Sequence, residues 1–318
     1  MPSSTSSSKL TWKTNLLIVL MGLVGFGLAA GVGQACYETL PGLKGWLFTR
    51  ADELPRQSHT GHAISDFLVY LHGLEGVVEP MRQAQVIFVG SSRAGFSFRD
   101  DFVARFEQAT GLKTYALGFP RSGMALAEKL IERYDLRPRV LVVAVDNVFF
   151  TDFVSQEILQ AEGLSQWEAW RQLREDRLSW WSRHHLHRYI PEFEIFGHQT
   201  ISVIYRNYRN GGWIVVQHPE ERLPVVEPTA PMPAPQRIKA REFVARMRER
   251  GVTVVFTAVA GGDYALEDLR ELARELDVPL LAPRLEGLTT GDPVHLDGPS
   301  ARRFSDAFLE EFRRWWKG

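Results

Sequence analysis

The sequence has little cysteine and almost no net charge, and these two absences exclude several classes of protein. Cys36 is the only cysteine in 318 residues, which excludes a disulfide framework and a cysteine-rich zinc site. Lys and Arg total 37 against 38 Asp and Glu, a net charge of −1, so composition excludes a basic nucleic-acid binder. With 45% hydrophobic and 24% charged residues, the chain is typical of a globular protein, either two domains or one α/β domain with an insertion.

One long hydrophobic run stands near the N-terminus. Residues Leu16–Ala35 carry no charge, and at about 1.5 Å per residue they are long enough to cross a hydrocarbon core of about 30 Å. Lys9 and Lys13 precede the run, which favours a cytoplasmic N-terminus and places the following chain in the periplasm or cell exterior. We therefore predict a cytoplasmic tail over 1–15 and a single-pass cytoplasmic-membrane anchor over 16–35.

Two alternatives to a retained anchor stay open at this point. Small residues between Ala29 and Ala35 would suit cleavage of a signal peptide, and Ala35-Cys36 is similar to a lipoprotein cleavage site, although Gly33 stands where an aliphatic residue is usual. The apolar run exceeds the usual core of a signal peptide, which favours the anchor.

Short apolar runs alternate with helical patterns over residues 85–150 and 237–318. The predicted strands are Gln85–Gly90, Lys113–Leu117, Val140–Val145, Val252–Val259 and Val278–Leu281; the predicted helices are Ile64–Leu71, Phe102–Ala109, Met124–Tyr134, Arg237–Arg250, Leu266–Leu276 and Pro299–Trp316. This alternation predicts right-handed βαβ units and a parallel sheet covered on both faces. We expect a linker and helical segment over 36–84, then an α/β domain over 85–318 with a helical insertion at 151–236. A Rossmann nucleotide fold is excluded, because residues 90–95 do not read G-x-G-x-x-G.

Ligands of parallel sheets bind beyond the carboxyl ends of the strands, so the residues that follow each strand are the candidates for chemistry. Ser91 and Ser92 follow the first strand. A serine at a strand-to-helix turn is placed for nucleophilic attack, but such serines more often cap the next helix.

A second candidate segment, Asp292-Pro-Val-His295, precedes the last helix. A serine nucleophile needs a base, and the base needs an orienting carboxylate. An aspartate three residues before a histidine, on a loop, can turn back to accept a hydrogen bond from the imidazole.

Gly90-Ser-Ser92 near the start of the α/β region and Asp292-x-x-His295 near its end together resemble the SGNH (GDSL-like) esterase and acyltransferase superfamily. The resemblance covers about 85–150 and 237–318 and implies a flavodoxin-like three-layer α/β/α sandwich and an acyl-serine intermediate. It implies Ser92 as nucleophile, His295 as base and Asp292 as its orienting carboxylate, with no metal and no cofactor. Ser91 stands where the family usually has aspartate.

The same resemblance implies an oxyanion hole. Its donors would be the backbone of Ser92, a glycine after the second strand, and an asparagine after the third. Gly118 and Gly123 both suit the glycine. Asn147 suits the asparagine, but the usual Gly-x-Asn-Asp has become Ala-Val-Asp146-Asn147, which leaves open which of these two side chains faces the site.

Three further features stand beside these blocks. Arg93 directly follows Ser92 and could bind an anionic substrate group, pair with Asp146, or lie on the surface. Residues 261–264 follow the fourth strand and could line the acyl pocket or the acceptor cleft, although such a stretch more often forms a loop without chemistry. His184, His185 and His187 lack the spacing of a helical zinc site, so we predict no metal there.

The sequence therefore predicts a membrane-anchored serine esterase or O-acyltransferase. Anchored relatives of the SGNH type act in D-alanyl transfer to teichoic acids and in O-acetylation of exopolysaccharides. The resemblance thus implies a cell-surface polysaccharide or other acylated glycan as substrate, and a membrane acyl-exporting or polysaccharide-synthase partner. The altered first and third blocks motivate the alternative: a catalytically degenerate domain that binds glycan or scaffolds a polysaccharide-synthesis complex.

Overall fold

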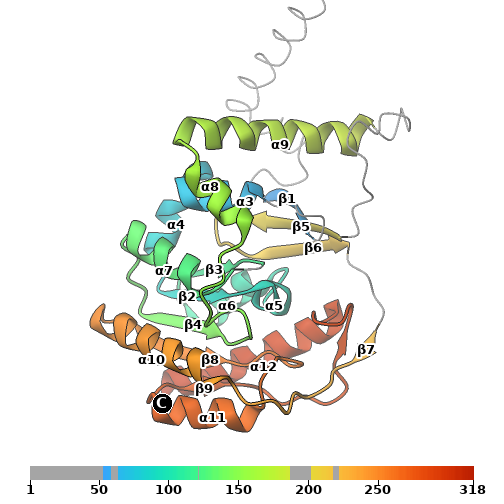
Figure 1. Cartoon of the computed structure of the whole chain (residues 1–318). Helices are drawn as coiled ribbons and strands as arrows, with labels where there is room; N and C mark the ends of the chain where they lie inside the picture. The colour runs from blue at the N-terminus through green and yellow to red at the C-terminus, as the bar shows by residue number, and fades with distance from the viewer. Residues whose placement is uncertain (1–52, 59–63, 121, 187–201, 218–221) are drawn as a thin grey trace, which may run out of the picture. The chain divides into compact units, whose positions relative to one another are not determined.

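A five-stranded parallel sheet forms the centre of the α/β domain (Figure 1). Its strands, in the spatial order β3-β2-β4-β8-β9, are β3 (Thr114–Gly118), β2 (Val86–Gly90), β4 (Val140–Ala144), β8 (Thr253–Thr257) and β9 (Leu280–Leu281). Every neighbouring pair is parallel. Counted along the chain within this sheet, the order is 2-1-3-4-5, which is the order of flavodoxin-like sheets.

This computed structural model describes residues 53–58, 64–120, 122–186, 202–217 and 222–318. They belong to one unit, Asp52–Gly318. Within these ranges, no helix is long and apolar enough to cross a membrane. The predicted span Leu16–Ala35 lies outside them, so the anchor and the localisation stay predictions.

The strands are predominantly apolar because helices cover both faces of the sheet. In β2, Ile87 and Val89 contribute to one core and Val86 and Phe88 to the other. The alternation of side chains along a strand sends successive residues to opposite faces, so a sheet buried on both sides requires uninterrupted apolar strands. The sequence pattern predicted this arrangement, and the structure confirms an α/β fold with helices flanking a parallel sheet.

The helices of the α/β region follow the predicted rhythm. They are α5 (Ser92–Ser97), α6 (Phe102–Thr110), α7 (Met124–Arg133), α10 (Ala234–Glu249), α11 (Leu266–Glu275) and α12 (Gly298–Lys317), preceded by α3 (Ile64–His72), η1 (Leu74–Gly76) and α4 (Val78–Gln83). On one face, rings from α6 and α12 surround Phe88: its ring centroid lies 5.2 Å from that of Phe106 and 5.7 Å from that of Phe308. The predicted helix from Arg237 begins three residues earlier, at Ala234.

The expectation of a helical insertion over 151–236 is wrong in its second half. The first half does form α8 (Gln156–Gly163) and α9 (Gln166–Leu186). The second half forms the antiparallel hairpin β5 (Ser202–Asn207) and β6 (Trp213–Gln217), and β5 also pairs with β1 (Glu53–Ser58). Strand β1 was not predicted within the 36–84 segment either. The pairing of β1 with β5 joins residues about 150 positions apart in the chain, and local periodicity does not report such a pairing.

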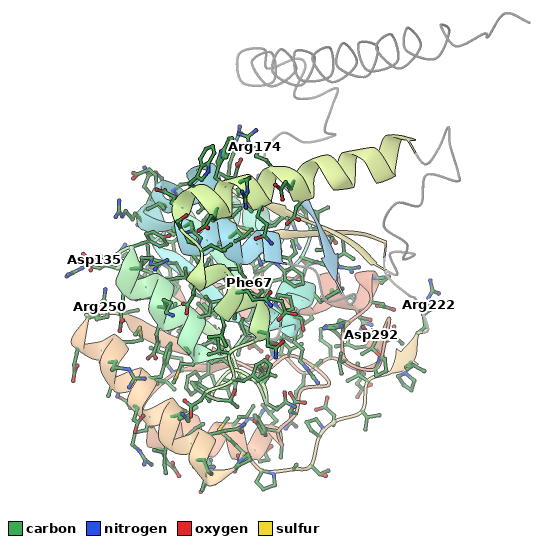
Figure 2. The ribbon with its side chains drawn as sticks, turned by 45° about the horizontal axis from the view of Figure 1, so that its top comes forward. Phe67, Asp135, Arg174, Arg222, Arg250 and Asp292 are labelled. Atoms are coloured by element: carbon green, nitrogen blue, oxygen red, sulfur yellow. The ribbon has the colours of Figure 1, made fainter. Side chains whose placement is uncertain are left out.

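The loops at the two ends of the parallel strands lie on opposite sides of the molecule. Asp135, before β4, pairs with Arg250, before β8, at 3.0 Å. Figure 2 shows these two residues on one side of the molecule and Asp292 on the opposite side. Asp292 lies between β10 (Thr289–Thr290) and α12, and β10 pairs with β7 (Leu223–Pro224).

Candidate active site

Ser92 is the first residue of α5, directly beyond the carboxyl end of β2. Ser91 is the N-cap of this helix, and its Oγ accepts a hydrogen bond from the backbone N of Arg93 at 3.3 Å. The turn needs a glycine before it, because a Cβ on Gly90 would lie 2.7 Å from Cβ of Ala94. The capping interpretation is thus confirmed for Ser91, which leaves the Ser92 hydroxyl available for a different contact.

Asp292 holds the loop that presents His295. Its Oδ1 accepts from the backbone N of Val294 at 2.8 Å and of His295 at 2.7 Å. The loop closes with Gly291 N donating to the His295 carbonyl at 2.9 Å. These contacts place the second carboxylate oxygen of Asp292 beside the imidazole.

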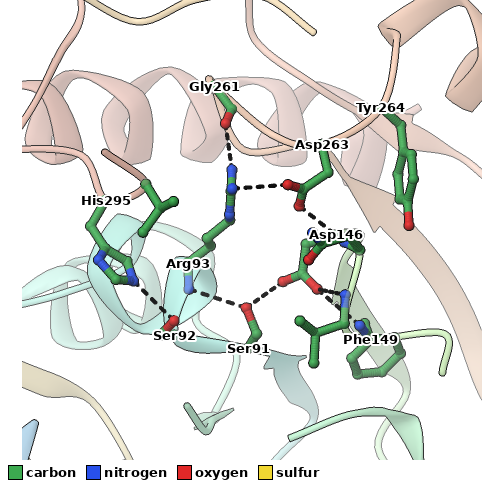
Figure 3. Close-up of polar contacts among 12 residues, drawn as sticks. Ser91, Ser92, Arg93, Asp146, Phe149, Gly261, Asp263, Tyr264 and His295 are labelled. Carbon is green, nitrogen blue, oxygen red and sulfur yellow. Dashed lines mark hydrogen bonds and ion pairs between the residues drawn. The ribbon is translucent and has the colours of Figure 1, made fainter. Parts of the chain in front are cut away.

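Ser92, His295 and Asp292 form a continuous series of hydrogen bonds. Nδ1 of His295 lies 2.7 Å from Oδ2 of Asp292, and Nε2 lies 2.9 Å from Oγ of Ser92 (Figure 3 draws the second contact). An ionised carboxylate only accepts, so Nδ1 carries the hydrogen and Nε2 is the acceptor for the serine hydroxyl. The structure therefore brings together all three residues singled out from the sequence, 203 positions apart for Ser92 and His295.

Two aromatic side chains support the imidazole of His295 by packing. The His295 ring stacks on Phe96 with centroids 4.2 Å apart and an interplanar angle of 27°, and His295 is only 3% exposed. Phe96 in turn meets Trp213 of β6 edge-to-face at 5.6 Å. A Cβ on Gly95 would lie 2.5 Å from this indole, so the approach of α5 to the hairpin requires a glycine. The insertion thus supports the histidine, a contribution that the sequence pattern did not indicate.

The two candidate oxyanion glycines lie in different surroundings. Gly118 ends β3, and its carbonyl accepts from Nη2 of Arg206 at the outer edge of the sheet. In an extended strand the N–H and C=O of one residue point to the same side, so the Gly118 amide points away from β2. Gly123 is the N-cap of α7, and a Cβ there would lie 3.0 Å from the carbonyl oxygen of Val148. Because the Gly118 N–H points away from β2, Gly123 is the better candidate for the donor. The choice of donor stays a prediction.

The side chain of Asp146, and not that of Asn147, points toward the turn that carries Ser91 and Ser92. Its Oδ2 accepts from the Ser91 hydroxyl, and its Oδ1 accepts from the backbone N of Val148 and Phe149, both at 2.9 Å (Figure 3). The side chain of Asn147 is exposed. The proposed side-chain oxyanion donor therefore rests on Asn147 adopting an inward conformation, and that role stays a prediction.

Burial raises the pKa of Asp146 above its ordinary value of 3.8, and the three hydrogen bonds offset this only in part. An acid with a higher pKa in the folded chain contributes stability that is complete below the unfolded value and is lost as pH rises through the folded value. Asn in its place keeps an acceptor for the two backbone amides and can donate to Ser91. We expect the free energy of unfolding of Asp146→Asn, relative to wild type, to increase as pH rises from about 4 to about 7.

Urea unfolding of both proteins across that pH range measures this difference. Asp277→Asn is the control for the substitution itself, because the side chain of Asp277 is fully exposed, and it should change the free energy of unfolding by no more than about 0.5 kcal/mol. A constant difference between Asp146→Asn and wild type would show that the Asp146 carboxyl does not titrate in this range.

Arg93 contacts the loop after β8 and not Asp146. Its Nη2 lies 3.0 Å from Oδ1 of Asp263, its Nη1 donates to the carbonyl of Gly261, and Oδ2 of Asp263 accepts from the backbone N of Asn147 at 3.0 Å (Figure 3). The alternative that pairs Arg93 with Asp146 is therefore wrong. Asp263 contacts Arg93 and the backbone of Asn147, so the 261–264 loop belongs to the candidate site, and a role in lining the acyl pocket stays a prediction. The sequence contained one signal for Asp263, which is its position after a predicted strand of the parallel sheet.

A buried ion pair lies between the hairpin β5–β6 and the edge strand β3. Arg206 of β5 is 0% exposed, and its Nε donates to Oδ2 of Asp66 at 2.9 Å. Its other nitrogens donate to the carbonyls of Gly118, Ala116 (3.3 Å) and Gly211 (3.1 Å). These contacts attach the hairpin to β3, which would otherwise be a free sheet edge.

No cluster of three or more His, Cys, Asp or Glu side chains in the described part of the chain could hold a metal ion. His184, His185 and His187 lie outside the residues whose side chains are described. A scan against protein-family models and a search of curated proteins gave no match to this sequence. The class that the fold and the candidate site define is an α/β protein with a five-stranded parallel sheet and a Ser-His-Asp series beyond its carboxyl edge.

Proposed function

We propose that this chain is a membrane-anchored serine esterase or O-acyltransferase of the SGNH type. The observation that carries the proposal is the series Ser92–His295–Asp292, with contacts of 2.9 and 2.7 Å. A nucleophile, a base and an orienting carboxylate in this order are what acyl transfer through serine requires. Many families share the parallel-sheet fold, so the site and not the fold supports the assignment.

The chemistry proceeds in two halves. Oγ of Ser92 attacks the carbonyl carbon of an acyl ester while Nε2 of His295 takes the hydroxyl proton. The tetrahedral intermediate collapses, its C–O bond to the leaving alcohol breaks, and His295 returns the proton to that alcohol. Water or a sugar hydroxyl then attacks the acyl-serine, His295 takes its proton, and Ser92 regains a proton as it leaves. Asp292 holds the imidazole in the tautomer that both halves need.

Backbone N–H groups stabilise the oxyanion in this proposal. They are those of Ser92 and of Gly123 or Gly118, with Asn147 as a third donor. Each donor of this kind is worth roughly 3 kcal/mol of barrier. The acyl group comes from a cell-surface polysaccharide or another acylated glycan, beside a membrane acyl-exporting or polysaccharide-synthase partner.

One observation favours a second candidate, a degenerate domain that binds glycan without catalysis. In the third block, the side chain that turns inward is the carboxylate of Asp146, which accepts hydrogen bonds from three donors. An acceptor so placed offers nothing to an oxyanion. The two candidates differ in whether Ser92 reacts.

A serine-directed fluorophosphonate tests the reactivity of Ser92. Attack by Oγ forms an O–P bond, fluoride leaves, and the proton passes to His295. We expect full-length protein in detergent to be labelled at Ser92, as located by peptide mass spectrometry. Ser92→Ala should not be labelled, whereas Ser97→Ala should be. Ser97 lies on the same helix, and its buried hydroxyl has no hydrogen-bond partner among the described residues. Absence of label from the folded wild type would favour the binding role.

A further inference from the structure

We infer that Asp263 determines the substrate class of this site: by neutralising Arg93, it excludes acyl groups that carry a negative charge. The inference rests on the proposed function, since it concerns the ester that Ser92 would attack. It goes beyond that function by naming a specificity-determining residue and the charge of the acyl group.

Arg93 lies at the carboxyl ends of the parallel strands, where open α/β sheets bind their ligands. It follows Ser92 on the first turn of α5, beyond β2, and its guanidinium reaches the loop beyond β8. Strand β4 lies between those two strands, so the side chain runs along the carboxyl edge of the sheet. Figure 3 shows its side chain between His295 and Asp146, extending from the Ser91–Ser92 turn toward Gly261 and Asp263. About 12% of the side chain is exposed.

An unpaired guanidinium in this place would attract a carboxylate or phosphate, because charge-assisted hydrogen bonds are among the strongest in proteins. Asp263 already occupies it, at 3.0 Å and with only 16% of its own side chain exposed. The hydrogen bonds of Arg93 within the described residues use one N–H of Nη1 and one of Nη2, which leaves three of its five N–H groups as donors. The N–H groups of a neutralised arginine suit an uncharged oxygen, such as a carbonyl or hydroxyl.

The surrounding charges act in the same direction. Beside the guanidinium of Arg93, these loops carry the carboxyl groups of Asp263 and Asp146, and Asp292 lies beside His295. A second negative charge brought by the acyl group would therefore be repelled, and in a partly buried site this repulsion is only weakly screened. A neutral residue in place of Asp263 has two effects. The guanidinium of Arg93 loses its counter-ion, and the site carries one negative charge fewer.

Two esters of similar length test this inference on the full-length protein in detergent. p-Nitrophenyl butyrate has an uncharged acyl group, and mono-p-nitrophenyl succinate carries a carboxylate. We expect wild type to favour butyrate. In Asp263→Asn, the ratio of kcat/KM for succinate over butyrate should rise at least about tenfold, and Arg93→Gln added to this variant should return the ratio to near the wild-type value.

Asp268→Asn is the matched control. Asp268 pairs with Arg237 at 2.8 Å with similar exposure, and it also accepts from a backbone amide, that of Met232. The ratio of kcat/KM for succinate over butyrate in Asp268→Asn should equal that of wild type. Both esters are measured on one preparation, so the ratio is independent of the fraction folded.

An unchanged ratio in Asp263→Asn, or a raised ratio that persists without Arg93, would overturn the inference while leaving the proposed function intact. A wild-type rate no faster than that of Ser92→Ala on both esters would overturn the proposed function, and the inference with it.

Discussion

Replacing Ser92 by Ala is expected to lower kcat for p-nitrophenyl acetate by on the order of 10⁶-fold, or to the uncatalysed rate if that is reached first. The variant keeps the helix and its cap, because Ser91 and not Ser92 caps α5. It removes the one atom that forms the bond to the acyl carbon, while His295 remains held by Asp292 and Phe96. Release of p-nitrophenol from the purified full-length protein measures the effect.

Groups that act as a unit do not contribute additively to kcat. We therefore expect Ser92→Ala and His295→Ala to cost about as much singly as together. Ser97→Ala, on the same helix, is the control and should retain the wild-type rate. If Ser92→Ala kept a substantial part of the activity, the Ser92–His295 contact would be structural, and any ester hydrolysis would belong to another group.

Arg206→Met is expected to lower the free energy of unfolding by about 3–5 kcal/mol, because it leaves a buried charge uncompensated. Asp66 is only 2% exposed, and the carbonyls of Gly118, Ala116 and Gly211 lose their donor in the same step. The stack of the guanidinium on the Phe119 ring, 4.5 Å from its centroid, is lost as well. Urea unfolding measures the change.

The double variant Arg206→Met, Asp66→Leu separates charge from packing. Removing both members of a buried pair is often close to neutral, so we expect it to recover a large part of the lost stability. Arg209→Met, at an exposed position of the same hairpin, should change stability by no more than about 0.5 kcal/mol. A small effect of Arg206→Met would mean that water reaches Asp66 in the variant and compensates its charge.

The parallel α/β region could be predicted from sequence because its strands and helices are local signals. An apolar run rich in valine such as Val140–Ala144 is buried on both faces, and its alternation with helical patterns favours a parallel sheet covered by helices. The hairpin β5–β6 gave no comparable signal. It is stabilised by pairing with β1 and by the burial of its own Trp213 against Phe96 and of its own Arg206 against Asp66. Strand β1, Phe96 and Asp66 lie far from the hairpin in sequence.

The candidate site divides in the same way. Ser92 and the Asp292–His295 pair stand at strand or helix ends in a recognisable order, so their proximity followed from topology. Asp263 sits in a glycine-containing loop that resembles many loops without chemistry. Its importance comes from contacting both Arg93 and the backbone of Asn147, and a single sequence does not report a contact across 170 positions.

The sequence by itself determined the alternation of strands and helices, the capping turn at Ser91 and the types of residue at the carboxyl edge of the sheet. Each of these depends on periodicity or on neighbours a few positions apart, which the sequence displays directly. The tertiary structure alone decided that His295 stacks on Phe96, that Arg206 anchors β3, and that Asp263 rather than Asp146 neutralises Arg93. These contacts depend on the relative placement of loops and on which buried charges find partners, and that placement is fixed by the packing of the whole chain.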